Sequence, residues 1–352
     1  MHRVVSTFLF ITVVSGTIIV ISSENWFIIW VGLELSTLAL VPILCSNFSP
    51  RNIEATIKYF LIQALSAALL LNGALIQAWL TGTWSTLDPV NNITSICLSI
   101  ALAFKIGLAP CHFWFPDVLQ GLPFFQGLII ATWQKIAPLI LLFYFSQLVF
   151  SYLLITASLL SILIGGWGGL NQTQIRKILA FSSIGNMGWL VLTSIYSLNA
   201  AIIMLIIYLT INTSLFLLFD HLGISTLGHL NTTSQLSPIS VALVLLIMLS
   251  LGGLPPLTGF ILKFTSLYLL ITNNFIILSS LMIVGSLLSL FFYLRISFNT
   301  SLILFPQHII SIASWRNSAA ISPLTPKTWL ISISAVLSTL AIPLTLPLYI
   351  II

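Results

Sequence analysis

The stretch Thr94–Pro110, TSICLSIALAFKIGLAP, decides the fold class, because it places Lys105 inside a run apolar enough to cross a lipid bilayer. Charged residues make up only 5% of the 352 residues, whereas hydrophobic residues make up 59%. A soluble globular domain carries about 25% charged residues. The composition therefore predicts an all-α polytopic membrane protein, since lipid offers no partners to backbone groups outside helices. The net charge of +5 is not clustered as in a nucleic-acid-binding patch, so no nucleic-acid partner is expected.

Apolar runs long enough to cross the hydrocarbon core recur along the whole chain. A helical crossing needs about 20 residues. The first run follows Arg3 and is too long for the apolar part of a cleaved signal peptide, so we expect it to remain as a helix. The sequence predicts eleven transmembrane helices, at residues 4–22, 25–45, 57–80, 92–118, 122–148, 151–170, 175–196, 199–220, 238–272, 275–297 and 329–350.

The charges in the expected loops support this count. Lysine and arginine gather on the side that the chain does not cross during insertion. With eleven spans, one side collects Arg3, Arg51, Lys58, Arg176, Lys177, Arg295, Arg316 and Lys327. The opposite loops carry only Glu24 and Asp88. We therefore expect the N-terminus and a long connection at 298–328 on the positive side, and the C-terminus on the other side.

Two of the expected spans contain residues that break helices. Span 92–118 contains KIGLAPCHFWFPDV, in which Pro110 lacks a backbone donor and crowds the preceding turn. Span 238–272 contains LSLGGLPPLTGFILK, in which two glycines are followed by Pro255 and Pro256. Irregular backbone at membrane depth survives only where it faces protein or water. Both breaks are therefore expected to face the interior of the protein.

The two broken spans are the fourth and the ninth, so spans one to five and six to ten can be two copies of one unit. An odd number of helices makes such copies inverted across the membrane, and inverted repeats with broken helices are typical of transporters. We expect the first five-helix repeat at 1–148 and the second at 151–297. A connection at 298–328 and a C-terminal transmembrane helix at 329–352 would follow.

Four charged side chains fall well inside the expected spans: Glu34, Lys105, Lys135 and Lys263. Each costs about 2.5 to 3.5 kcal/mol at the bilayer centre on insertion scales. A static ion pair would account for Glu34 and one lysine, but one carboxylate cannot neutralise three lysines. Burial favours a neutral lysine and a nearby carboxylate favours a charged one, so relative movement of the two would load or unload a proton. This pattern indicates ion translocation.

The remaining chemistry-bearing residues give weaker signals. His112 follows the break in the fourth span and could relay protons, or could be a hydrogen-bonded structural residue. Cys45, Cys97 and Cys111 have neither disulfide nor metal-site spacing. The sequence contains no phosphate-binding glycine loop, no histidine pair placed for haem and no nucleophile with a base. No cofactor or metal site is therefore expected on this chain.

Six segments carry a resemblance to a known family. In chain order, from about residue 20 to residue 297, they are SSENWFIIWVGLELSTLALVPIL, EATIKYFLIQA, FKIGLAPCHFWFPDVLQG, TWQKIAPL, GGWGGLNQTQIRKILAFSSIGNMGW and LSLGGLPPLTGFILKF. Together they resemble the antiporter-like subunit 2 family of mitochondrial NADH:ubiquinone oxidoreductase, respiratory complex I. Eleven spans agree with the shortened animal form of that subunit. Residues 298–352 resemble the family only in length and character.

The resemblance implies a proton-translocating module in the membrane arm of a complex that reduces ubiquinone with NADH. In the family, the glutamate of GLE and the lysines of KIGLAP, WQK and GFxxK form a polar axis at mid-membrane. These positions correspond to Glu34, Lys105, Lys135 and Lys263. Asn186 stands where many relatives have histidine, and asparagine can order water but cannot titrate.

The resemblance also implies the surroundings of the chain. It would be encoded in mitochondrial DNA and lie in the inner membrane, with its N-terminus in the matrix and its C-terminus in the intermembrane space. NADH, FMN, iron–sulfur clusters and ubiquinone would belong to the assembled complex rather than to this chain. Expected partners are other membrane-arm and accessory subunits, and lipid such as cardiolipin. The residues alone also suit a stand-alone cation/proton antiporter, or a structural scaffold whose charges merely pair.

Overall fold

The structure is a computed structural model that describes residues 3–86, 88, 90–145, 151–230, 238–303 and 326–340. In these residues the regular elements are helices, apart from two isolated β-bridges. Eight helical stretches of the described residues are long and apolar enough to cross a membrane, with Phe124–Phe145 counted as one stretch. The expectation of an all-helical polytopic membrane protein is confirmed. Most of the expected connection at 298–328, and residues 341–350 of the expected span at 329–350, lie outside the described residues.

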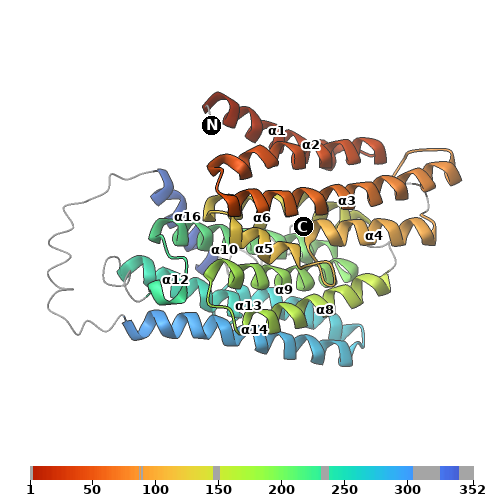
Figure 1. Ribbon diagram of the computed structural model, residues 1–352. Helices are drawn as coiled ribbons and strands as arrows, with labels where there is room; N and C mark the ends of the chain where they lie inside the picture. Colours follow the sequence, from red (N-terminus) through yellow and green to blue (C-terminus); the bar gives the residue numbers. More distant parts are fainter. Residues whose placement is uncertain are drawn as a thin grey trace. The chain divides into compact units, whose positions relative to one another are not determined.

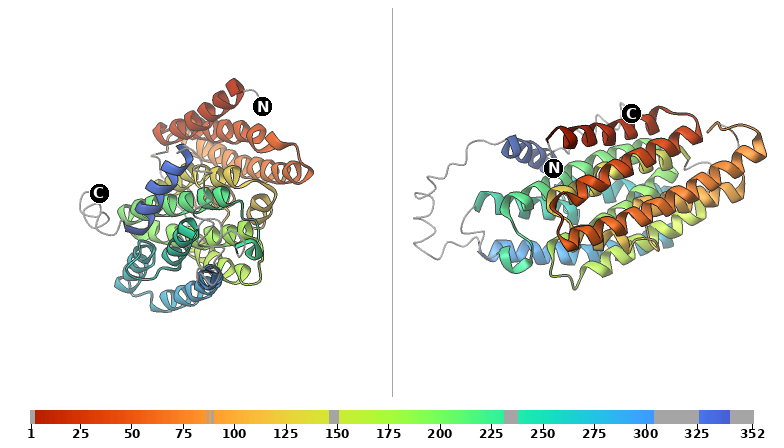
Figure 2. Two further views of the ribbon diagram at one scale, coloured as in Figure 1. Left: turned by 90° about the vertical axis from the view of Figure 1, so that its left-hand side faces the viewer. Right: turned by 45° about the horizontal axis from the view of Figure 1, so that its top comes forward.

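The first compact unit comprises residues 1–161 and 190–198 (Figure 1). Its helices are α1 (Arg3–Ser22), α2 (Trp26–Leu44), η1 (Cys45–Asn47), α3 (Pro50–Thr81), α4 (Asn92–Ile106), α5 (Trp114–Gly121), α6 (Phe124–Ala131) and α7 (Trp133–Phe145), with parts of α8 (Ser151–Gly169) and α9 (Ile175–Tyr196). Helix α2 packs between α1 and α3, and α3 also packs on α4 and α5. Figure 2 shows α1 and α2 (red) beside α3 (orange) from two further sides.

The first two helices approach closely because each has a glycine where they cross. A Cβ on Gly16 would lie 2.8 Å from the carbonyl oxygen of Gly32, and a Cβ on Gly32 would lie 3.0 Å from that of Gly16. Small residues at such crossings are how membrane helices pack without a hydrophobic driving force. Thr17, which follows Gly16, is thereby buried in the interior of the unit.

Helix α3 has 32 residues, more than one crossing requires, so at least one end extends past the hydrocarbon core. It begins with Pro50 after Ser49, whose hydroxyl oxygen accepts from the backbone nitrogen of Asn52 at 3.3 Å. Proline at the first position and serine before it are standard start signals. The helix ends at Gly82, whose left-handed backbone (φ 76°) closes its last turn.

The first end of α3 carries basic residues. Lys58 forms ion pairs with Glu54 at 2.8 Å and with Asp117 of α5 at 3.1 Å. Arg51 lines a surface pocket together with Glu54, Lys58 and Asp117. Lys58 therefore ties α3 to α5, the segment that follows the first helix break.

The far end of α3 is acidic. The loop after it returns to the loop between α1 and α2, where the backbone nitrogen of Thr86 donates to the carbonyl oxygen of Glu24 at 2.9 Å. The hydroxyls of Ser85 and Thr83 donate to the carboxylate of Asp88, which lowers the pKa of that carboxyl. Lysine and arginine thus lie only at the first end of α3, beside Glu54 and Asp117, whereas the far end has acidic residues alone, as the sequence predicts.

The second compact unit comprises residues 162–189 and 199–352, of which parts are described. Besides parts of α8 and α9, it contains α10 (Leu198–Leu222), η2 (Leu227–His229), α12 (Pro238–Gly252), α13 (Gly259–Thr272), α14 (Ile276–Ile303) and α16 (Pro326–Leu340). Helix α12 packs on α13, α14 and α16 (Figure 1). Helix α12 therefore joins these three described helices of the unit.

Both expected helix breaks are present, and they have the same order of residues, Gly-Leu-x-Pro. Helix α4 stops before Gly107, which has φ 81°, and α12 stops before Gly253, which has φ 77°. In each case the next leucine nitrogen donates five residues back, from Leu108 to Ala103 at 3.0 Å and from Leu254 to Leu249 at 3.4 Å. This bond is typical of a helix that ends at a left-handed glycine.

A third break lies where the sequence predicts one continuous span, 122–148. Helix α6 ends before Thr132 and α7 begins after it, with φ −115° and ψ −70° at the threonine. Both the backbone nitrogen and the hydroxyl of Thr132 donate to the carbonyl oxygen of Leu128, at 2.9 and 2.6 Å. Pro138 inside α7 leaves a further carbonyl without its helical donor. The prediction of an unbroken helix is therefore wrong.

Candidate functional site

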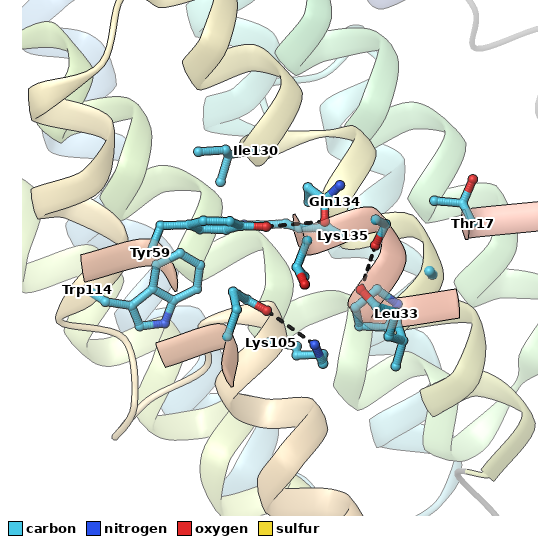
Figure 3. Close-up of a pocket in the computed structure, with 13 residues that line it drawn as sticks. Thr17, Leu33, Tyr59, Lys105, Trp114, Ile130, Gln134 and Lys135 are labelled. Atoms are coloured by element: carbon cyan, nitrogen blue, oxygen red, sulfur yellow. Dashed lines mark hydrogen bonds between the residues drawn. The ribbon is translucent and has the colours of Figure 1, made fainter. Parts of the chain in front are cut away.

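Polar side chains from five helices of the first unit surround a small internal cavity (Figure 3). The centre of a water molecule can occupy about 10 Å³ of it, which is close to the least space that holds one water. The polar residues that line it are Thr17, Ser36, Thr37, Tyr59, Gln63, Lys105, Gln134 and Lys135. Two of the lysines predicted from the sequence thus share one cavity.

Lys105 occupies the last turn of α4, directly before the first break, and is 4% exposed. A cation is favoured there because the last carbonyls of a helix carry partial negative charge. Its Nζ donates to Oε1 of Gln63 on α3 at 3.5 Å, which is a long hydrogen bond. The ammonium is therefore held weakly by a neutral side chain.

Lys135 lies in the first turn of α7, after the third break, and is 2% exposed. Its Nζ is 4.1 Å from the centroid of the Phe115 ring. This is the geometry of a cation–π contact, which favours a charged lysine. Phe115 belongs to α5, the helix that follows the first break, so the position of this ring over Lys135 depends on the path of the chain through that break.

Tyr59 and Gln134 complete the polar lining. The hydroxyl of Tyr59 donates to Oε1 of Gln134 at 3.4 Å, and Figure 3 shows the two directed toward each other. The other amide atom of Gln134, Nε2, is buried and has no partner among the described residues. A buried unpaired donor beside a cavity of this size is suited to bind a water molecule.

The sequence did not predict Tyr59, Gln63 or Gln134, because neutral polar side chains are common inside helical proteins. A signal was available in α3, where Tyr59 and Gln63 are four residues apart and so lie on one face of the helix. Gln134 directly precedes Lys135 in the first turn of α7, which begins after the break at Thr132 that the sequence did not predict.

Glu34 does not form the direct ion pair with Lys105 that the sequence suggests. Its carboxylate lies close enough to Lys105 and Tyr59 to interact with them electrostatically, but not within ion-pair distance. Oε2 instead accepts from the hydroxyl of Thr37, one turn later in α2, at 3.2 Å. Each charge is thus held by a neutral polar neighbour.

Lys263 lies in the second unit and is not among the residues around this cavity. Its Nζ donates to the carbonyl oxygen of Gly252, the last residue of α12, at 2.7 Å. That carbonyl lacks an intrahelical donor because the helix ends there. The ammonium therefore stabilises the C-terminal end of the first half of the broken span.

His112 lies within the first break and is 3% exposed. Its Nδ1 is 3.2 Å from the carbonyl oxygen of Pro110, and its ring lies 4.2 Å from that of Phe113. It does not line the cavity. Among the described residues, no group of three or more histidine, cysteine, aspartate or glutamate side chains is arranged to hold a metal ion.

Broken helices, buried lysines and a water-sized polar cavity define a class: membrane proteins with a polar path inside a helical bundle. Residues 23–289 match the family model described as NADH:quinone oxidoreductase/Mrp antiporter, TM. Residues 290–349 match that described as NADH dehydrogenase subunit 2 C-terminus. The second match corrects the expectation that residues 298–352 resemble the family only in length and character.

Similar proteins cover the whole chain. NADH-ubiquinone oxidoreductase chain 2 of Strongylocentrotus purpuratus is 86% identical over 351 residues, 100% of each chain. That of Paracentrotus lividus is 74% identical over 350 residues, 99% of each chain. The chain belongs to the NADH-ubiquinone oxidoreductase chain 2 family, the antiporter-like membrane subunits of respiratory complex I.

Solved structures agree with this assignment. A chain of respiratory complex I from Thermus thermophilus, determined with bound aureothin, superposes with a TM-score of 0.79 at 26% identity, over 97% of this chain and 80% of that one. A chain of the Mrp complex from a Dietzia species superposes with a TM-score of 0.77 at 18% identity, over 97% and 75%. The second likeness concerns the fold alone. Both of these chains come from multi-subunit membrane complexes.

Proposed function

We propose that Lys105, Lys135 and Lys263 carry the protons that this module translocates, and that Glu34 controls their charge. The observation that supports this most directly is the shared cavity of Lys105 and Lys135. Two ammonium groups around space for one water repel each other strongly when little solvent screens them. The arrangement therefore favours one charged lysine at a time, with a water between them.

The transfer of one proton between these lysines is balanced through that water. One N–H bond of the charged lysine breaks as its proton passes to the water. The water then gives a different one of its protons to the neutral amine of the second lysine. Gln63 and Gln134 orient the participants through their amides. Movement of Glu34 toward Lys105 would favour the charge on Lys105, and movement away would send the proton on.

Lys263 would act at the second break. While it is charged, its Nζ donates to the free carbonyl of Gly252. A neutral amine would hold that carbonyl less strongly, since hydrogen bonds from charged donors are about twice as strong. Loss of the proton would therefore release the end of α12. His112 is the proposed relay at the first break, where its ring lies beside the carbonyl of Pro110.

The proposed arrangement in the membrane keeps eleven spans, with inverted repeats at 1–148 and 151–297, the connection at 298–328 and the last helix at 329–352. The shared Gly-Leu-x-Pro order of the two breaks supports the repeat. The basic and acidic ends of α3 support an N-terminus in the matrix and a C-terminus in the intermembrane space of the inner membrane. NADH, FMN, iron–sulfur clusters and ubiquinone would be bound elsewhere in the complex, and lipid such as cardiolipin would cover the apolar surface.

The decisive experiment replaces Lys105 with methionine in the whole assembled complex, reconstituted in closed vesicles. The control is Lys58→Met, which removes a lysine whose side chain is 42% exposed and paired at the surface. We expect fewer protons pumped per NADH oxidised in Lys105→Met and an unchanged ratio in the control. A normal ratio in assembled Lys105→Met complex would contradict the proposal.

Two further measurements separate the other functions. A stand-alone antiporter would exchange cations for protons as a single purified chain in liposomes, whereas a pump subunit would be active only within the NADH-oxidising complex. A scaffold with merely paired charges predicts that the double substitution Glu34→Gln and Lys105→Met leaves proton pumping unchanged. We expect the double variant to pump as poorly as Lys105→Met.

A further inference from the structure

The second unit contains a buried polar cluster that the proposed function does not use. We call it the tyrosine cluster: Ser182 and Ser183 of α9, Tyr208 and Asn212 of α10, and Tyr293 of α14. None of the five is more than 2% exposed. Five polar side chains from three helices, brought together inside an apolar bundle, require their hydrogen bonds to be made with one another or with water.

The two phenols connect the three helices. Tyr208 lies beside Ser183 and Asn212 and interacts electrostatically with Tyr293, whose hydroxyl lies beside Ser182. Both serine hydroxyls donate to carbonyl oxygens one turn earlier in α9, at 2.8 Å each. The hydrogens of both serine hydroxyls are therefore engaged by the backbone of α9, and each phenol lies beside a serine oxygen.

Asn212 leaves this network incomplete. It is fully buried, and neither its amide nitrogen nor its amide oxygen has a hydrogen-bond partner among the described residues. Burying an amide without partners is unfavourable, so a partner such as water is expected. The amide nitrogen of Asn186, one turn after Ser182 on the same face of α9, is also buried and unpaired. Unpaired amides beside phenols are the surroundings in which buried water is bound.

The tyrosine cluster also reaches the second helix break. Lys263 donates to the carbonyl oxygen of Gly252, as described above. On the same glycine, a Cβ would lie 4.0 Å from Cδ2 of the Tyr293 ring. Tyr293 and Lys263 therefore flank one residue, Gly252, at the end of α12.

We propose that the tyrosine cluster, with water bound at Asn212, is a proton path that serves Lys263. This inference rests on the proposed function, because the path is useful only if Lys263 carries a proton. A protonated water at Asn212 gives one proton to the phenol oxygen of Tyr208, whose own O–H proton passes through water to Tyr293 and then, in the same way, to the neutral amine of Lys263. Both tyrosines therefore remain neutral phenols, and the net result is one proton moved from the water at Asn212 to Lys263.

The test uses Tyr208→Phe and Tyr293→Phe in the assembled complex, since each change removes one hydroxyl and keeps the ring. The matched control is Tyr268→Phe, on the exposed face of α13. A second control is Ser214→Ala, which is buried in α10 with its hydroxyl bound to the carbonyl of Ile211 at 2.7 Å. We expect each cluster variant to slow NADH-driven proton pumping about fivefold, the factor that one lost hydrogen bond produces. Both controls should keep the parent rate.

The ratio of rates in H₂O and D₂O separates a proton path from a structural role. If the phenols pass protons, this ratio should rise in the cluster variants, whereas a packing defect would leave it unchanged. An unchanged rate and ratio in either assembled phenylalanine variant would overturn the inference, and if one variant fails to assemble, the other carries the test. Lys263→Gln, measured in parallel, shows which of the two proposals fails. Normal pumping in Lys263→Gln would refute the proposed function. Lost pumping in Lys263→Gln with normal pumping in both tyrosine variants would refute only the proton path through the tyrosine cluster.

Discussion

The two helix breaks have the same Gly-Leu-x-Pro order, yet each places its lysine differently. In the first unit, Lys105 precedes the break and binds a side chain of another helix, Gln63. In the second unit, Lys263 follows the break and binds the backbone carbonyl that the break exposes, at Gly252. The first lysine is free to exchange partners, whereas the second is part of the structure of its own break.

This difference shows how one backbone motif can serve two purposes. In α5, which follows the first break, Phe115 contacts Lys135. Asp117 of the same helix forms a surface ion pair with Lys58 of α3, and this pair stabilises the first break. The second break is stabilised by its own lysine, because the ammonium of Lys263 donates to the carbonyl oxygen of Gly252. Charge on that lysine and the geometry of the break should therefore be coupled in the second unit and largely separate in the first.

The largest effect is expected from Lys263→Gln. Glutamine can still donate to the carbonyl of Gly252, so the complex should assemble, but it cannot carry a proton. Proton pumping should fall at least about a hundredfold, the lower end of what a positioned acid or base contributes. The measurement is proton uptake per NADH oxidised in closed vesicles. Full pumping would mean that Lys263 serves only to cap α12.

The next largest effect is the difference in stability between Gly107→Ala and Gly253→Ala, the alanine substitutions at the two helix breaks. Both glycines have left-handed backbone, so alanine costs about 1 to 2 kcal/mol at either position. A Cβ at Gly107 meets Trp114 at an ordinary 3.5 Å, whereas at Gly253 it would lie 2.9 Å from Cδ of Lys263. We expect Gly253→Ala to lose about 1 kcal/mol more than Gly107→Ala.

Thermal inactivation of the two assembled glycine variants measures this difference. Gly253→Ala should inactivate at the lower temperature and should also pump less, because its Cβ displaces Lys263. If Gly107→Ala were the less stable variant, the claim that only the second break is fastened by its own lysine would be wrong.

Gln63→Leu should have a smaller effect, restricted to the first unit. It removes the acceptor of Lys105, but that hydrogen bond is long, so about 1 kcal/mol is lost, or about fivefold in pumping rate. The control is Gln77→Leu, also buried in α3, which removes the acceptor of the Thr94 hydroxyl instead. Equal loss of pumping in both variants would show a general packing defect rather than a role for Gln63.

The smallest effect is expected from Asp117→Asn. The side chains of Asp117 and Lys58 are 50% and 42% exposed, and exposed ion pairs contribute about 0.2 to 1 kcal/mol. Lys58 would also keep Glu54. The loss of thermal stability should be measurable at low salt and vanish at high salt, as screening predicts. A large loss that persists in high salt would mean that the anchor of the first break is buried in the assembled complex.

The sequence predicted the parts of the fold that depend on strong local signals. Apolar length located the helices, and glycine followed by proline located the breaks after Ile106 and Gly252. The break at Thr132 has no such signal, since neither a glycine nor a proline marks it, and there the threonine hydroxyl and its own backbone nitrogen both donate to one carbonyl. A change of backbone direction that depends on tertiary packing cannot be read from residue order.

The candidate site was predicted in its charges but not in its contacts. The cost of burying a lysine identified Lys105 and Lys135 at once, whereas Gln63 and Gln134 carry no such cost. The expected ion pair of Glu34 with Lys105 failed for a related reason, since Thr37 and Gln63 satisfy the two charges separately. Neutral partners of this kind depend on which helix faces meet.

The size of the cavity in the first unit has a consequence for ion selectivity. A proton needs only one water between Lys105 and Lys135, and the cavity offers space for about one. A sodium or potassium ion must keep several oxygen ligands around it as it moves, and these do not fit beside two lysines in that space. We expect this part of the module to exclude alkali cations by volume and by charge, without a dedicated selectivity filter.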